Sequence, residues 1–67
     1  MSIARTTEIA SSSDKSFEDA VEKGIKRYAK TIDHVESAWI KEQKVIVKGD
    51  EIEEYRVTLK VSFLLKD

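Results

Sequence analysis

The chain has 67 residues, and its 12 Lys and Arg against 13 Asp and Glu give a net charge of −1 at pH 7. This length allows one small domain, residues 1–67. The absence of cysteine excludes disulfide scaffolds, thiolate zinc sites and thiol nucleophiles. The balanced charge lacks the basic surface that nucleic-acid binding requires. Because no apolar stretch has the length of a signal peptide or a membrane span, we expect a cytoplasmic protein without nucleic-acid or membrane partners.

The small size of the chain also predicts self-association. A domain this short buries only about 60% of the surface that its unfolded chain exposes. Small domains usually gain further stability from disulfides, a metal ion or oligomerisation. The chain has no cysteine and one histidine, His34. Oligomerisation is therefore the expected source of additional burial.

The first predicted element is a strand over residues 2–10, which alternates imperfectly but is rich in β-branched side chains. Three serines follow at residues 11–13. Serine hydroxyls bond readily to nearby backbone, so this run predicts a turn and a helix cap. A phosphate-binding loop is the alternative, but the run lacks the glycines and the lysine that such a loop needs.

A helix is predicted next. Ser16 and Asp19 have the spacing of a capping box, with Asp in place of the usual Glu or Gln. Gly24 lies on the apolar face of this helix, where we expect it to permit close approach to a sheet. Apolar residues recur at spacings of three and four and form one stripe, made of Phe17, Ala20, Val21, Gly24, Ile25, Tyr28 and Ile32.

From Val35 onward the apolar residues alternate with a period of two, which indicates two strands. Ala38 and Ile40 share one face of the first of these strands. Residues 48–51 form the predicted turn, with Gly49 and Asp50 at its centre. The last strand, residues 52–65, places six apolar side chains on one face: Tyr55, Val57, Leu59, Val61, Phe63 and Leu65.

The order strand, helix, strand, strand predicts an α+β domain in which one helix packs on a three-stranded antiparallel sheet. A single helix covers only one face of such a sheet. Ser37, Trp39 and Lys41 belong to the other face, beside Arg56 and Lys60 of the last strand. Trp39 is the unusual member of this polar surface. It has three interpretations: contact with a neighbouring subunit, stacking on a planar ligand, or simple exposure.

The sequence resembles the dodecin family over nearly its whole length. The matching segments are residues 8–13, 16–20, 27–32 and 54–63, of which the last is the most specific. The resemblance implies a β-α-β-β chain whose sheet partly wraps around the helix, and a hollow homododecamer built from it. It also implies storage of a small molecule rather than catalysis. Many dodecins bind flavins such as FMN, riboflavin or lumichrome in pockets between subunits.

Two family markers of flavin binding are absent from their expected positions. The tryptophan that stacks on the flavin in the family corresponds to Ser37, and Trp39 lies two residues later. The glutamine that contacts the flavin corresponds to Arg56. Because residues two apart on a strand face the same side, Trp39 is able to reach the same space as Ser37. Ser37, Trp39 and Arg56 are the candidate flavin-binding residues, although packing at a subunit interface is the favoured role of Trp39.

The alternative function is that of a dodecin that binds no flavin, like the calcium-binding member of the family, and that holds ions or other small molecules or acts as a scaffold. His34 lacks the partners that a metal site needs, so we interpret it as a surface residue. Four acidic residues surround the predicted turn: Asp50, Glu51, Glu53 and Glu54. We interpret them as a solvated surface, with a weak calcium site shared between subunits as the other reading. No catalytic constellation is evident within one chain, so we expect no enzyme activity, and a site shared between subunits is a remote alternative.

Overall fold

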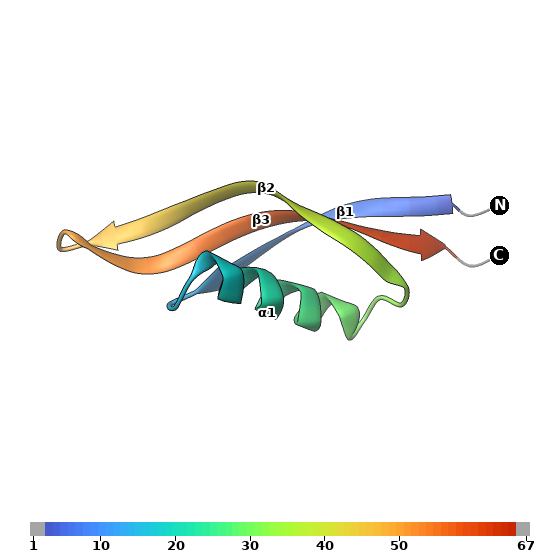
Figure 1. The fold of residues 1–67 in the computed structure, drawn as a ribbon, viewed down its shortest axis with the longest axis horizontal. Coiled ribbons are helices and arrows are strands. Elements are labelled where there is room, and N and C mark those ends of the chain that lie inside the picture. The colour runs from blue at the N-terminus through green and yellow to red at the C-terminus, as the bar shows by residue number, and fades with distance from the viewer. Residues whose placement is uncertain (1–2, 66–67) are drawn as a thin grey trace.

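The computed structural model describes residues 3–65 (Figure 1). Its elements are strand β1 (Ile3–Ser13), helix α1 (Phe17–Ala29), strand β2 (Val35–Lys48) and strand β3 (Glu51–Leu65). This order confirms the predicted β-α-β-β chain. The strands form one antiparallel sheet in the order β1-β3-β2, so the long β3 is central.

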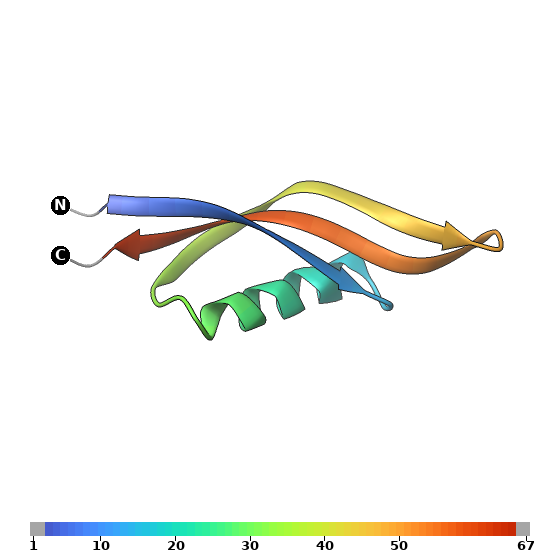
Figure 2. The same ribbon diagram turned by 180° about the vertical axis from the view of Figure 1, so that it is seen from behind.

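The molecule is elongated, with extents of 52 × 19 × 13 Å. Helix α1 lies along one face of the sheet, and the β2–β3 hairpin extends well beyond it (Figures 1 and 2). The helix packs on β1 and β3 rather than on β2. The face of the sheet that the helix covers is therefore only partly closed by this chain.

The core confirms the predicted apolar stripes. The buried apolar residues are Ala20 of α1 and four residues of β3, Val57, Leu59, Val61 and Phe63. Burial of such an aliphatic side chain stabilises a fold by about 1.5–3 kcal/mol. The partly buried apolar residues around them are Ile9, Phe17, Val21, Ile25, Tyr28 and Val35.

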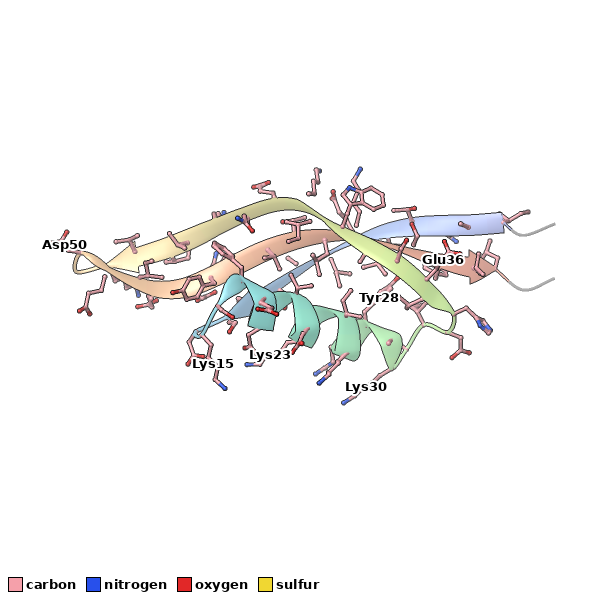
Figure 3. All side chains as sticks on the ribbon, viewed as in Figure 1. Lys15, Lys23, Tyr28, Lys30, Glu36 and Asp50 are labelled. Atoms are coloured by element: carbon pink, nitrogen blue, oxygen red, sulfur yellow. The ribbon has the colours of Figure 1, made fainter. Side chains whose placement is uncertain are left out.

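Aromatic pairs extend this core toward both ends of the helix. The rings of Phe17 and Tyr55 meet edge to face with centroids 5.2 Å apart, and those of Tyr28 and Phe63 lie 6.4 Å apart. The Tyr28 hydroxyl forms a 2.6 Å hydrogen bond with Thr7 Oγ1 of β1. Figure 3 shows Tyr28 on the side of the helix that faces the sheet, while Lys23 and Lys30 point away from it.

The start of the helix differs in one respect from the sequence prediction. Ser11 to Ser13 are not a turn, because β1 continues through them and Ser13 pairs with Tyr55. The long β3 supplies backbone partners for these residues, and the hydroxyl of Ser13 donates a 2.6 Å hydrogen bond to Asp19 Oδ2. Ser2, the predicted first residue of this strand, lies outside the described residues.

The cap at Ser16 is as predicted, since its Oγ accepts a 3.0 Å hydrogen bond from Asp19 N. The carboxylate of Asp19 bonds to Ser13 instead of closing the capping box on the Ser16 backbone. That hydrogen bond, with a smaller contribution from Lys23, lowers the pKa of Asp19. The helix ends at Ala29, so Ile32 of the predicted stripe follows the helix.

The tip of the hairpin has the predicted turn. Gly49 has φ of 57° and Asp50 has φ of 64°, the pair of positive angles that a two-residue type I′ turn requires. Glycine adopts this conformation without strain, and aspartate is among the few other residues that tolerate it. Figure 3 places Asp50 at the far end of the hairpin, remote from the helix.

Gly24 marks the closest approach of α1 to the sheet. A Cβ atom at this position would lie 3.0 Å from Ser11 Cβ and 3.4 Å from Leu59 Cδ1. The predicted role of this glycine is confirmed. It also explains why a residue with poor helix propensity occupies a buried helical position.

We predict that Gly24→Ala destabilises the protein despite the helix propensity of alanine, which is about 1 kcal/mol better. Overpacking costs about 1–3 kcal/mol, so the free energy of unfolding should fall by about 1 kcal/mol. Urea denaturation at one fixed protein concentration measures the change. Adding Ser11→Gly removes the atom in conflict and should restore most of the loss. A stabilised single variant would show that helix packing at Gly24 is loose.

Candidate functional site

The sheet has an outer face, which we define as the face opposite α1. It is formed by the residues of β3 that alternate with the buried ones and by their partners on both sides. Arg56 lies between Ser12 and Lys44, Thr58 between Ala10 and Glu42, Lys60 between Glu8 and Trp39, and Ser62 between Thr6 and Ser37. No element within residues 3–65 covers this face (Figures 1 and 2).

Trp39 is half exposed, with 50% of its surface accessible to solvent. The Lys60 ammonium lies over its indole ring, with Nζ 5.8 Å from the ring centroid. Ser37 occupies the next position on the same face, opposite Ser62. The structure therefore confirms that Ser37 and Trp39 face the same side of the sheet.

A β-bulge follows Trp39 and changes which side chains share its face. The pairing of β2 with β3 shifts between Ile40 and Glu42, so Lys41 is an extra residue. Glu42 pairs with Thr58 and joins the outer face, whereas simple alternation from Trp39 assigns it to the covered face. The run of polar residues 41–44 has no alternation, so the sequence carries no signal for this bulge.

Lys41 connects the two edge strands across β3. Its Nζ lies 2.7 Å from Glu8 Oε1, and both side chains are largely exposed. The hydrogen bond and the charge of Lys41 lower the pKa of Glu8, and the same contact raises the pKa of Lys41. An exposed pair of this kind adds little stability. Its main effect is to fix where the Glu8 carboxylate lies on the outer face.

Arg56 is held by a neighbour in its own strand. Its Nε donates a 2.8 Å hydrogen bond to Glu54 Oε1. This bond is the main cause of the lowered pKa of Glu54. The two residues border a hollow of about 390 Å³, lined by Ala10, Ser11, Ser12, Lys44, Glu54, Arg56, Val57 and Thr58.

The hollow at Arg56 and the exposed Trp39 are separate features of one chain. Arg56 lies four residues from Lys60 along β3, which is roughly 13 Å in a strand. The structure thus groups Ser37 with Trp39 and places Arg56 farther along the same face. Lys44, which the sequence analysis did not single out, lies opposite Arg56 and lines the same hollow.

The remaining candidate residues have simpler surroundings. His34 is exposed just before β2, with φ of 63°, and its carbonyl oxygen accepts a hydrogen bond from Leu64 N. Among residues 3–65, no three His, Cys, Asp or Glu side chains are grouped so as to hold a metal ion. Within the same range, no helix has the length and apolar character needed to span a membrane.

Comparison with known proteins identifies the family. The family model for Dodecin matches residues 3–66, so the chain belongs to the dodecin family. A mutant of the T. thermophilus dodecin is 25% identical with a TM-score of 0.94, and 100% of both chains are covered. The dodecin from Streptomyces davaonensis is 26% identical with a TM-score of 0.94, over 98% of this chain and 97% of that one.

A third similar structure is the calcium dodecin of Mycobacterium tuberculosis, described as a calcium-chelating antigen with a novel calcium-binding site. It is 28% identical to this chain with a TM-score of 0.82, over 96% of this chain and 91% of that one. No curated protein matches the chain. The dodecin resemblance seen in the sequence is thus confirmed for both family and fold.

We predict that Lys41→Met raises the pKa of Glu8 toward its ordinary value. The Lys41 hydrogen bond and charge are the two largest causes of the present shift, and methionine keeps the length of the side chain without either. NMR titration of the Glu8 side-chain carboxyl carbon measures the change. Lys44→Met is the matched control and should leave the Glu8 pKa unchanged. An unaltered pKa in Lys41→Met would mean that the two side chains do not pair in solution.

Proposed function

We propose that this dodecin is a small-ligand binding and storage protein that acts as a homododecamer, with a flavin as its ligand. The observation that carries the proposal is Trp39, a half-exposed indole on a sheet face that the single helix of the chain leaves open. Large exposed aromatic side chains are typical of binding surfaces. A planar ring stacked on Trp39 is the contact that this surface suits best.

The oligomeric part of the proposal is supported by apolar side chains that the chain leaves uncovered. Ile40 lies on β2, with which α1 makes little contact, and is 46% exposed. Val47 and Ile52 pair across the hairpin beyond the helix and are also more than half exposed. A second copy that covers these three residues adds the burial that a 67-residue domain lacks.

In the proposed site, Ser37, Trp39 and Arg56 contact the ligand from more than one subunit. Trp39 supplies the aromatic surface, because Ser37 has no ring at the family position. Arg56 is too far from Trp39 within one chain to share a small ligand with it. The proposal therefore requires that the Arg56 of one subunit lie near the Trp39 of another, where a guanidinium is suited to bind a phosphate.

The second candidate is a dodecin that binds cations or other small molecules, or serves as a scaffold, without flavin. Two observations favour it. Arg56 is already paired with Glu54, which reduces its availability to a ligand. In addition, the calcium dodecin, which has a similar fold, is described as a calcium-binding protein. In this reading, acidic side chains near the hairpin from several copies provide the oxygen ligands.

Both candidates describe binding without catalysis. The single histidine of the chain, His34, lies at the start of β2 and pairs only through its backbone carbonyl among the described contacts. The outer face around Trp39 offers hydroxyl groups at Ser37 and Ser62 without an adjacent imidazole base. Such a surface is suited to hold a ligand and not to transform it.

The assembly is tested by native mass spectrometry of protein purified without added ligand. We expect one particle at twelve times 7.7 kDa, plus the mass of any retained ligand. An Ile40→Asp, Val47→Asp double variant should give smaller species, because burial of unpaired carboxylates is unfavourable. A Lys26→Asp, Lys30→Asp variant on the outward side of α1 is the control. A folded wild-type monomer at micromolar concentration would refute the assembly.

Flavin binding is tested by titrating FMN, riboflavin and lumichrome and following flavin emission, which a stacked tryptophan quenches. We expect Trp39→Phe to weaken binding about twofold to tenfold, in line with the value of an aromatic pair. A Ser37→Trp, Arg56→Gln double variant restores both family markers and should bind more tightly than wild type.

Three results separate the candidates. Binding that weakens in Trp39→Phe supports the flavin site, and tight binding unaffected by that change places the flavin elsewhere. Failure of all three flavins to bind, together with calcium uptake in a calorimetric titration, favours the cation-binding alternative.

A further inference from the structure

Lys60 is a charged residue that contacts the exposed Trp39. The two side chains are direct cross-strand partners, and the ammonium lies over one face of the indole at 5.8 Å from its centroid. The Lys60 side chain is partly buried between its neighbours in the central strand. A ligand that stacks on the other face of the ring therefore lies close to a fixed positive charge.

The neighbouring carboxylates act on Lys60 without pairing directly with it. Glu8 is the partner of Lys60 on β1, and the charge of Lys60 helps to lower the pKa of Glu8, but its carboxylate pairs with Lys41 at 2.7 Å and Lys41 has the larger effect. Glu42 lies in the adjacent row opposite Thr58, and its charge makes a small contribution to the raised pKa of Lys41. Lys41 and Lys48 each form an ion pair with a glutamate. Among residues 3–65, by contrast, no carboxylate lies within ion-pair distance of the Lys60 ammonium.

The neighbouring row of the outer face on the other side of Trp39 contains no charged side chain. The next row of the outer face consists of Thr6, Ser62 and Ser37, of which Thr6 and Ser62 share a 3.0 Å hydrogen bond. These hydroxyls accept or donate hydrogen bonds and repel no anion. The surface around the indole thus combines an aromatic plane, neutral hydroxyls on one side, and on the other the Lys60 ammonium beside the Glu8–Lys41 ion pair and Glu42.

We propose that Lys60 makes the Trp39 surface selective for a planar aromatic ligand that carries a negative charge close to its ring. The ring of the ligand stacks on the face of the indole opposite Lys60, and its charge reaches past the edge of the indole toward the Lys60 ammonium. This inference rests on the proposed ligand-binding function and names the chemical class of the ligand. It assigns the preference for a charge next to the ring to Lys60, whereas Arg56, which pairs with Glu54, is proposed to meet a phosphate farther from the ring.

A matched pair of ligands tests the proposal. Lumiflavin and carboxymethylflavin share one ring system and differ at N10, where the second carries a carboxylate next to the ring. Titrations of the assembled wild-type protein should show that carboxymethylflavin binds about threefold to tenfold more tightly at low salt, as for a single charge contact at a surface. Added salt should reduce this ratio, because exposed charges are screened.

Variants of Lys60 identify the cause of the preference. Lys60→Gln should bring the ratio of the two affinities close to one, through a loss of affinity for carboxymethylflavin that exceeds any change for lumiflavin. Lys60→Arg should keep the preference, because it retains the charge. Lys26→Gln, on the exposed side of the helix, is the control and should behave as wild type. Native mass spectrometry of each variant confirms that assembly is intact.

The possible failures are distinguishable. If wild type binds both flavins equally, Lys60 selects no anion, while the proposed ligand site stands. If the preference persists in Lys60→Gln, another cation is responsible and the assignment is wrong. If neither flavin binds to wild type, both the proposed flavin site and this inference are overturned.

Discussion

The structure depends on one geometric constraint: a single short helix packs on a much larger sheet. Helix α1 has 13 residues and is about 20 Å long, whereas the molecule extends over 52 Å. Gly24 lets the helix approach β1 and β3 closely, and in that position it makes little contact with β2. The core is therefore well packed but narrow. Apolar side chains on β2 and the hairpin therefore stay exposed in the single chain and are available for contacts with another molecule.

The same constraint produces the candidate site. Among residues 3–65, neither the helix nor a second layer covers the side chains of the outer face. Pairing of β1 and β2 with β3 fixes which of these side chains are neighbours. Lys41 pairs with Glu8, and Arg56 pairs with Glu54, so each of these charges is compensated locally. Trp39 and Lys60 form a neighbouring aromatic and cationic pair on this face that is available to something outside the chain. We therefore expect ligand binding by this dodecin to take place on the outer face of its sheet.

Much of the fold was predictable because local patterns report burial directly. In β3, side chains alternate between a buried and an exposed face, and the structure buries Val57, Leu59 and Val61 as the alternation requires. The helical stripe, the Ser16 cap and the Gly49-Asp50 turn are likewise short-range features. Each depends on residues within a few positions of one another, so no knowledge of the distant chain was needed.

The sequence by itself determined the element order, the buried faces, the dodecin resemblance and the presence of an uncovered tryptophan. Tertiary structure decided the contacts across β3. The strand that continues through Ser13 and the bulge at Lys41 follow from pairing with β3, which no local pattern encodes. The Lys60–Trp39 and Lys41–Glu8 contacts join residues 21 and 33 positions apart. Such contacts depend on strand register, and register is set by the whole sheet rather than by any one segment.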